Sequence, residues 1–368
     1  MSYRPEKINV RADFPFPLDN PPPFHQKLLD FGERPYWSPD GKRIAFVESN
    51  YGDICEIDME TREVRNLTKN LGDHHSFLRV LFLPNGDYIL IGPREFKDRY
   101  TSRQVESELW IMDKDAKSPP KPLGRRIFEG CGVSRTGSRI TYSMNGNHDP
   151  KIGTPEDFEV HVTEIDYGPD GPKLGADKII YRSKGGFDPE PQDFKNNDTE
   201  IVMAEYFNHP TVDKKDWYCT VKGVVIATGE VKLYITEPQI HNECEGIFPD
   251  ETHICLESSC DGGALSHTVD LWKLALDGSG RRVRMTRMID RLPWRATNSN
   301  LSPDGKWLAF MLNIAGSEAG YGMGLGLLDM EAFEKSEYAT QWETPQSRAG
   351  RKTPEYVSYM EKAANLKK

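Results

Sequence analysis

The feature of this sequence that most limits its fold is a short polar turn that recurs between apolar segments. Two copies read Ser-Pro-Asp-Gly, at 38–41 and 302–305, and the segments KRIAFVES and KWLAFML follow them. The remaining copies are variants of the same turn. Counted from the residue before the proline or its equivalent, the six turns begin at 38, 83, 134, 194, 248 and 302, which gives spacings of 45, 51, 60, 54 and 54 residues. A polar turn between strands that returns about every 40 to 50 residues is typical of a β-propeller.

Each repeat also contains a second hairpin. Segments such as 53–68, 108–124 and 270–286 alternate apolar and polar residues and then turn at Asp, Gly or Thr, which is the chemistry of a β-hairpin. We therefore predict an all-β chain that forms a single propeller of six blades with four strands each. The alternative is a seven-bladed ring with a further unit between 140 and 240, where two turns are farthest apart.

The N-terminal segment is expected to close the ring. The sixth repeat lacks a clear outer strand after Met330, whereas the segment 25–31 resembles the outer strands of the other repeats. A first strand that completes the last blade removes a free sheet edge, which would otherwise pair with other chains. Thr353 followed by proline predicts a short helix near the C-terminus. The predicted parts are an N-terminal arm at 1–23, the propeller at 24–336 and a C-terminal tail at 337–368.

The composition excludes several classes of function. The formal net charge of the 368-residue chain is −10, which argues against general nucleic-acid binding, because that function needs a basic surface to replace counterions. No apolar stretch is long enough to span a membrane, and the N-terminus lacks the apolar core of a secretory signal. If the chain begins where its gene begins, we expect a cytoplasmic protein. The six cysteines show no dense pattern and are expected to be reduced, with a Cys255–Cys260 disulfide as the alternative.

The turns with their flanking strands, WSPDGKRIAFVES and LSPDGKWLAFML, resemble the repeat of TolB-like propellers over about residues 30–332. TolB is a periplasmic interaction protein, and similar repeats occur in prolyl oligopeptidase-like peptidases and in oligogalacturonate lyases. The peptidase function is excluded here, because the sequence has no Gly-x-Ser-x-Gly motif. The lyases resemble this chain in size and in lacking a secretion signal. Their metal-binding histidine cluster has no matching motif here, so the resemblance assigns no site residues.

Residues that precede each turn should face the centre of the ring, since the first strands of all blades converge there. When the repeats are aligned by their turns, several charged and polar side chains fall four, five or seven places before the turn. Guanidinium groups bind carboxylates and phosphates in bidentate fashion, so we predict an anion site at the channel mouth. The predicted substrate-binding residues are Arg34, Arg79, Glu190, Arg295 and Asn298. The alternative is that the arginines form internal ion pairs with Glu33, Glu129, Glu190 and Glu243.

The segment 239–245 is the strongest candidate for a metal or acid–base site. Its residues His241, Glu243 and Glu245 alternate, so they are expected to share one face of a strand. A histidine with two carboxylates fits a divalent cation such as Mn²⁺, Ca²⁺ or Zn²⁺, and the same groups could transfer protons as base and acid. The alternative is that both carboxylates pair with arginines across the ring.

Two functions of different classes are compatible with these patterns. The first is an intracellular enzyme that acts on a small anionic carbohydrate at the mouth of the central channel. In a lyase of this kind, arginines neutralise the carboxylate of a uronic acid, and a histidine or carboxylate removes the neighbouring proton. The predicted catalytic residues are His75, His241 and Glu243. The second function is that of a non-catalytic, TolB-like propeller that binds a ligand or a protein partner.

Overall fold

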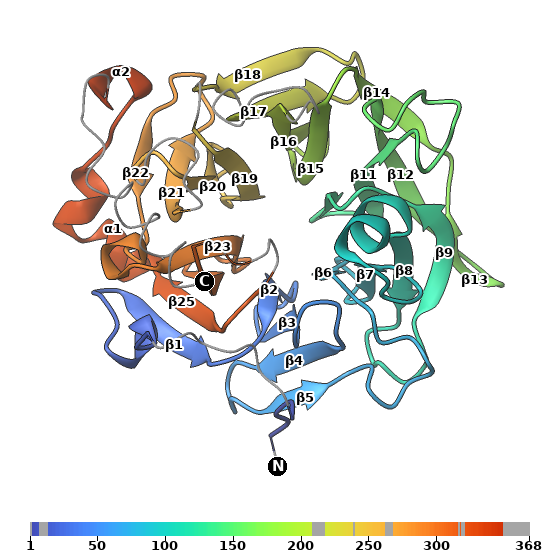
Figure 1. Cartoon of the computed structure of the whole chain (residues 1–368), viewed down its shortest axis with the longest axis horizontal. Helices are drawn as coiled ribbons and strands as arrows, with labels where there is room; N and C mark the ends of the chain where they lie inside the picture. Colours follow the sequence, from blue (N-terminus) through green and yellow to red (C-terminus); the bar gives the residue numbers. More distant parts are fainter. Residues whose placement is uncertain are drawn as a thin grey trace, which may run out of the picture.

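The computed structural model describes residues 2–6, 14–207, 218–237, 240–261, 268–315, 317 and 321–348. The strands in these residues form six sheets, which Figure 1 shows arranged in a ring. In five sheets the first strand along the chain lies nearest the centre of the ring, whereas in the sixth the N-terminal strand lies at the rim. The structure confirms the all-β, six-bladed propeller. The described residues between 140 and 240 belong to two of the six blades and do not form a seventh.

The first three blades follow one another along the chain. Blade 1 consists of β2 (Glu33–Trp37), β3 (Arg43–Val47), β4 (Ile54–Asp58) and β5 (Val64–Asn66). Blade 2 consists of β6 (Arg79–Phe82), β7 (Tyr88–Gly92), β8 (Glu108–Met112) and β9 (Lys121–Arg126). Blade 3 consists of β10 (Cys131–Val133), β11 (Arg139–Asn145), β12 (Phe158–Gly168) and β13 (Gly171–Leu174), and β14 (Lys178–Ser183) also pairs with β12. The extra strand and the long β12–β13 hairpin explain why the turns are farthest apart here.

The last three blades complete the ring. Blade 4 consists of β15 (Phe187–Lys195), β16 (Glu200–Phe207), β17 (Tyr218–Val225) and β18 (Val231–Ile235). Blade 5 consists of β19 (Asn242–Ile247), β20 (His253–Ser258), β21 (Asp270–Ala275) and β22 (Arg282–Arg284). Blade 6 consists of β23 (Trp294–Leu301), β24 (Trp307–Ile314), β25 (Leu325–Asp329) and the N-terminal strand β1 (His25–Leu29).

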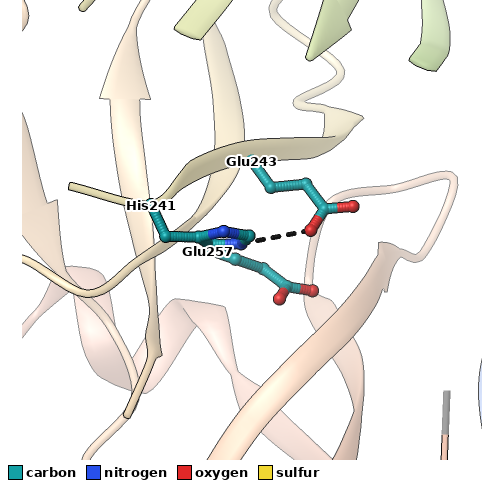
Figure 2. Close-up of side chains that lie close together, drawn as sticks. All are labelled: His241, Glu243 and Glu257. Carbon is teal, nitrogen blue, oxygen red and sulfur yellow. Dashed lines mark ion pairs between the residues drawn. The ribbon is translucent and has the colours of Figure 1, made fainter. Parts of the chain in front are cut away.

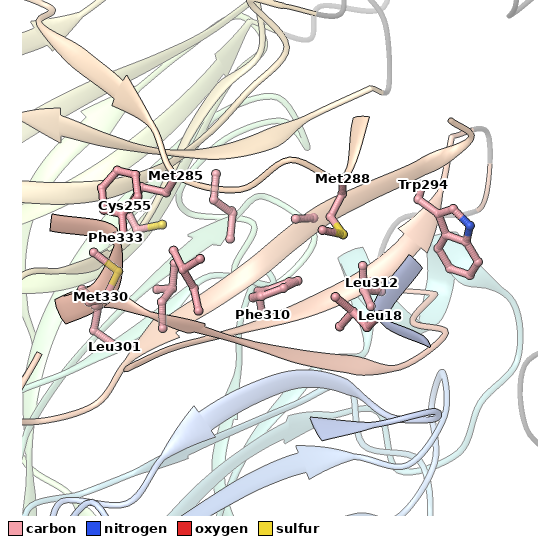
Figure 3. Close-up of a cluster of buried hydrophobic side chains, with 14 of the residues drawn as sticks. Leu18, Cys255, Met285, Met288, Trp294, Leu301, Phe310, Leu312, Met330 and Phe333 are labelled. Atoms are coloured by element: carbon pink, nitrogen blue, oxygen red, sulfur yellow. The ribbon is translucent and has the colours of Figure 1, made fainter. Parts of the chain in front are cut away.

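The N-terminal strand closes blade 6, as the sequence predicts. β1 runs antiparallel to β25, with His25 opposite Leu328. The arm before β1 adds Phe16 and Leu18 to the core of this blade. Phe16 packs edge-on against Trp294, with 5.5 Å between the ring centroids. Figure 3 shows Leu18 and Trp294 within the buried cluster, so segments from both ends of the propeller share one core.

The recurring turn is built from local hydrogen bonds. Ser38 Oγ donates to Asp40 Oδ1 at 2.6 Å and accepts from the backbone N–H of Arg43 at 3.0 Å. The copy at 302–305 repeats these two bonds at 2.7 and 3.0 Å. Gly41 has a φ of +68°, a conformation that is costly for other residues. Each turn therefore fixes the hairpin between the first two strands of its blade, and with it the residues that reach the centre.

The hydrophobic core lies between neighbouring blades rather than at the centre of the ring. One cluster joins Ala45 and Ile54 of blade 1 to Leu90 and Trp110 of blade 2. Another joins blades 5 and 6 with the N-terminal arm. Because apolar packing holds adjacent blades together, the centre of the ring is left to polar and charged side chains.

The helices are short and lie outside the blades. They are η1 (Pro17–Asp19), the π-helix η2 (Thr101–Val105), η4 (Ile289–Arg291), α1 (Met330–Glu334), η5 (Glu337–Thr340) and α2 (Pro345–Arg348). Within the described residues, none of them has the length and apolar character that crossing a bilayer requires. The helix predicted after Thr353 falls outside the described residues. All six cysteines are buried and free, so the alternative Cys255–Cys260 disulfide is not formed.

Candidate channel site

The first strands of all six blades surround a narrow cavity. We call the space between these strands the channel and this cavity the chamber. The chamber has a volume of about 40 Å³, which is room for a few molecules of the size of water. Every inner strand contributes to its lining, through residues that include Arg34, Arg79, Cys131, Gln192, Glu245 and Asn298. Of the residues predicted from the aligned turns, Arg34, Arg79 and Asn298 thus line the chamber.

Bulges in four inner strands shape the chamber. The register between the first and second strands shifts within 33–36, 191–193, 244–247 and 297–300. A bulge inserts an extra residue into one strand and redirects side chains. The shifted positions include the chamber residues Arg34, Gln192, Glu245 and Asn298. Arg34 and Asn298 have φ values of +50° and +43°, which are uncommon for residues other than glycine.

The acidic side of the channel is formed where β19 begins and β20 ends. Figure 2 shows the side chains of His241, Glu243 and Glu257 close together. His241 Nε2 lies 3.1 Å from Glu243 Oε2, and Glu257 faces Glu243 directly across the β19–β20 ladder. One ligand atom from each of the three residues lies within 4.8 Å of the others. We call these three residues the His–Glu–Glu group.

In this group Glu257 takes the place that the sequence assigned to Glu245. Strand alternation predicts that 241, 243 and 245 share a face, but the bulge after Cys244 interrupts the alternation. Glu245 instead lines the chamber and shares a hydrogen bond with Glu257. Next to the turn Ile247 pairs with Ile254, and that register would place Ser258 opposite Glu243. The bulge shifts the register by one residue and brings Glu257 there instead, so the sequence offered no simple signal for it.

The glutamates on this side cannot all be ionised together. Burial acts to raise the pKa of Glu243, but hydrogen bonds from His241 and Tyr206 hold it lower, at about 2. Burial and the charge of Glu243 raise the pKa of Glu190 and of Glu245 to about 7. The same causes raise the pKa of Glu257 well above its usual value. At neutral pH the acidic side therefore combines one ionised carboxylate with carboxyl groups that exchange protons.

The basic side of the channel is formed by three arginines around the buried carboxylate of Glu129. Arg34 pairs with one oxygen of Glu129 and Arg103 of η2 pairs with the other. Arg79 Nη2 lies 3.9 Å from the same carboxylate. Burial and the charge of Arg34 lower the pKa of Arg103 to about 10, so it stays protonated at neutral pH. Internal ion pairing, the alternative that the sequence left open, thus occurs on this side.

Several hydrogen-bond donor atoms of the described residues on the basic side take no part in this pairing. Among the described residues, Nε and Nη1 of Arg34, Nε of Arg79 and Nε2 of Gln192 are buried and have no hydrogen-bond partner. Arg103 was missed by the turn alignment because it lies in the loop between β7 and β8, not on an inner strand. That loop, PREFKDRYTSRQVES, carries four basic and three acidic residues, so its composition gave no clear signal.

Arg295 and Asn298, both predicted to bind substrate, lie beside the acidic group. Arg295 Nε donates to Asn313 Oδ1 at 2.6 Å. Burial lowers the pKa of Arg295 to about 10 against the opposing charges of Glu257 and Glu243. The backbone N–H of Asn298 donates to Glu257 Oε1, and its Nδ2 donates to Glu245 Oε1 at 3.3 Å. Asn298 therefore holds two of the carboxyl groups in place.

His75 has its contacts elsewhere. Its Nδ1 lies 2.7 Å from Asp53 Oδ1, next to the start of β4, the third strand of blade 1. Asp53 also accepts a hydrogen bond from Thr68 at 2.6 Å. The structure thus brings together His241, Glu243 and the predicted binding residues, whereas the catalytic role of His75 stays a prediction.

Known proteins match this chain in structure but not in sequence. No protein-family model and no curated protein matches it. A gluconolactonase from Xanthomonas campestris is 13% identical over 83% of this chain and 88% of that one, with a TM-score of 0.52. An oligogalacturonate lyase in complex with manganese is 14% identical over 82% and 79%, with a TM-score of 0.48. A protein described as TolB from Agrobacterium tumefaciens is 13% identical over 79% and 72%, with a TM-score of 0.35.

The shared feature is the propeller fold. The structural neighbours include both groups whose repeats the sequence resembles, the TolB propellers and the oligogalacturonate lyases. At identities this low the comparison extends to the fold and no further. Any assignment of function to this chain therefore depends on the residues of its own channel.

Proposed function

We propose that this propeller is an enzyme that acts on a small carboxylated carbohydrate in its channel, by proton abstraction and β-elimination. The observation that carries the proposal is the convergence of the His–Glu–Glu group in a channel whose other side contains Arg34 and Arg79. Carboxyl groups and a histidine supply proton transfer, and guanidinium groups supply the recognition of a carboxylate. Both requirements of the reaction are met by buried or half-buried residues of the channel.

The His–Glu–Glu group is suited to holding a divalent cation. Its donors are one imidazole nitrogen and two carboxylate oxygens, and these atoms lie within 4.8 Å of one another. Mn²⁺ and Zn²⁺ accept such a mixed set of ligands, and Ca²⁺ is disfavoured by the imidazole. A cation bound there would supply positive charge that stabilises the negative charge developing on the substrate.

The other residues of the channel supply binding and proton transfer. Arg34 and Arg79 bind the carboxylate, and their charge makes the hydrogen on the neighbouring carbon more acidic. Glu190 removes that proton, since its raised pKa of about 7 lets it exchange protons at neutral pH. The electron pair forms a carbon–carbon double bond as the carbon–oxygen bond at the next carbon breaks. The departing oxygen takes a proton from Glu245, whose pKa is also raised to about 7.

The sequence left open a second assignment of the base. In it, His241 removes the proton while Glu243, 3.1 Å away, orients the imidazole and balances its charge. That assignment needs no cation, whereas the first one occupies His241 as a ligand. Dependence of turnover on an added cation distinguishes the two.

The experiment is an elimination assay with the full chain and short uronic-acid oligomers. The double bond formed next to the carboxylate absorbs ultraviolet light, so turnover is followed directly. We expect turnover that depends on Mn²⁺ and falls about 100-fold or more in Glu190→Gln, in line with loss of a general base. Glu164→Gln, which changes an exposed carboxylate on blade 3, is the matched control and should retain activity. Folded wild-type protein that turns over no uronide with any of the cations would overturn the proposal.

A non-catalytic binding propeller is the second candidate. The observations that favour it are the ion pairs of Glu129 with Arg34 and Arg103 and the small volume of the chamber, about 40 Å³. A binding propeller would bind sugar acids and release them unchanged. Recovery of the intact ligand after prolonged incubation with cation-loaded protein is the result that favours this candidate over the enzyme.

A further inference from the structure

We infer that the chamber is a pocket for a single carboxylate, which Arg34, Arg79 and Gln192 bind next to the His–Glu–Glu group. The inference deepens the proposed function, because it selects which end of the substrate enters the channel. It rests on that function only for the identity of the rest of the ligand. The carboxylate pocket itself is argued from the chamber.

The first argument is the set of buried donors that lack partners. Arg34, Arg79 and Gln192 are 5%, 8% and 9% exposed. Between them they carry four donor atoms without a hydrogen-bond partner in the described structure: Nε and Nη1 of Arg34, Nε of Arg79 and Nε2 of Gln192. A buried donor that lacks a partner destabilises the folded state, so native proteins keep few of them. Their concentration in residues that line one cavity indicates that a bound acceptor completes them.

The second argument is the backbone that holds these residues. Arg34 and Gln192 both lie at bulges, and Arg34 has a φ of +50°. This conformation is strained for a residue other than glycine, and such strain is often found at ligand sites. Asn298 occupies the equivalent place in its own repeat with a φ of +43° and also lines the chamber. The same distortion in two blades directs polar side chains towards one small space.

The third argument is the charge around the chamber. Three arginines share the carboxylate of Glu129 on this side. The acidic groups in the chamber wall are already engaged. Asp193 pairs with Arg135 at 2.5 Å and accepts from the backbone N–H of Ile247 at 2.8 Å. Glu245 accepts from Asn298 and shares a hydrogen bond with Glu257. An anion bound beside Arg34 and Arg79 therefore meets guanidinium groups that share a single carboxylate with Arg103.

The size and shape of the chamber select the anion. A volume of about 40 Å³ accommodates a planar carboxylate but not a sugar ring. Guanidinium groups match a planar oxyanion through paired N–H donors. Glu245 lines the chamber and touches Glu257, so a carboxylate bound there has its neighbouring carbon beside the His–Glu–Glu group. The substrate class that follows is a sugar acid with a free carboxylate at an accessible end.

The direct test uses formate as the probe, with the purified full chain in buffer free of divalent cations. Isothermal titration calorimetry should show saturable binding of about one formate per chain. Gln192→Glu places a negative charge in the wall of the chamber and should weaken binding at least tenfold, as should Arg79→Gln. Arg139→Gln, which changes a half-buried arginine of blade 3 that does not line the chamber, is the control and should leave the affinity unchanged. Formate binding that does not saturate, or that is equal in all four proteins, would overturn the pocket. If Arg79→Gln does not fold, Gln192→Glu decides.

A second measurement identifies the source of the carboxylate and separates this inference from the proposed function. Glucuronate should compete with formate, whereas its methyl ester should not. If neither compound competes with formate, the pocket binds small free carboxylates only, and the assignment of the substrate class is overturned. Formate binding without any uronide turnover would support the carboxylate pocket and overturn the proposed enzymatic function. Uronide turnover that neither formate nor Gln192→Glu reduces would support the enzyme and overturn the carboxylate pocket.

Discussion

The two sides of the channel compensate buried charge in opposite ways. On the basic side, guanidinium groups keep their protons, so their charge must be balanced by partners such as Glu129. On the acidic side, the glutamates lie close together and can reduce their repulsion by taking up protons. The raised pKa of Glu190 is an example of this effect. The acidic side can therefore change its charge by taking up or releasing protons, whereas the charge of the basic side is fixed. The proposed binding of a cation on one side and a carboxylate on the other depends on this difference.

The largest expected effect comes from removing the carboxylate that balances the basic side. Glu129→Gln leaves Arg34 and Arg103 buried without this partner and should lower the free energy of unfolding by about 3–5 kcal/mol. Urea unfolding measures the change. Glu164→Gln removes an exposed carboxylate that pairs with the half-buried Arg139 and should cost no more than about 1 kcal/mol. Equal, small losses in both variants would show that the basic side is not held by this ion pair.

The pH dependence of stability should come from the acidic side. The pKa of Glu190 is raised from 4.5 to about 7 by burial and by Glu243. The folded state therefore binds more protons than the unfolded state between these values, and the stabilisation is full below pH 4.5 and is lost as the pH rises to 7. The loss is on the order of 3 kcal/mol. Unfolding curves of wild type and Glu190→Gln between pH 4.5 and 8 should diverge in slope, and parallel curves would contradict the assignment.

Cation binding should distinguish the two glutamates that compete for the third ligand position. Glu257→Gln removes a member of the His–Glu–Glu group and should weaken Mn²⁺ binding by tenfold or more. Glu245→Gln should change the affinity by no more than a few-fold, because Glu245 lines the chamber instead. Calorimetric titration of both variants measures the difference. A larger loss of Mn²⁺ affinity in Glu245→Gln than in Glu257→Gln would instead support the ligand set predicted from the sequence, with Glu245 as the third ligand.

The smallest effect is expected at His75. Its partner is Asp53, and its side chain is 41% exposed. His75→Gln should change the free energy of unfolding by less than about 1 kcal/mol and leave both Mn²⁺ affinity and turnover unchanged. Loss of turnover in a folded His75→Gln protein would show that this histidine reaches the substrate, as the sequence suggested.

The fold could be predicted because its determinants are local. The bonds among Ser38, Asp40 and Arg43 lie within six residues of sequence, and the same pattern marks each blade that keeps the motif. Alignment by these turns also placed Arg34 and Arg79 correctly at the centre of the ring. The remaining site residues depend on features without a local signal. A bulge moved Glu245 out of the predicted group, and Arg103 enters from the loop between the second and third strands of blade 2.

The most direct test of the account is an anomalous diffraction map from crystals grown with Mn²⁺. We expect one strong peak enclosed by His241, Glu243 and Glu257, at about 2.0–2.3 Å from the ligand atoms. The partners of the basic side should stay in place, since Glu129 is already paired with Arg34 and Arg103. No peak at the His–Glu–Glu group in cation-saturated crystals would contradict the proposed binding of a cation on the acidic side.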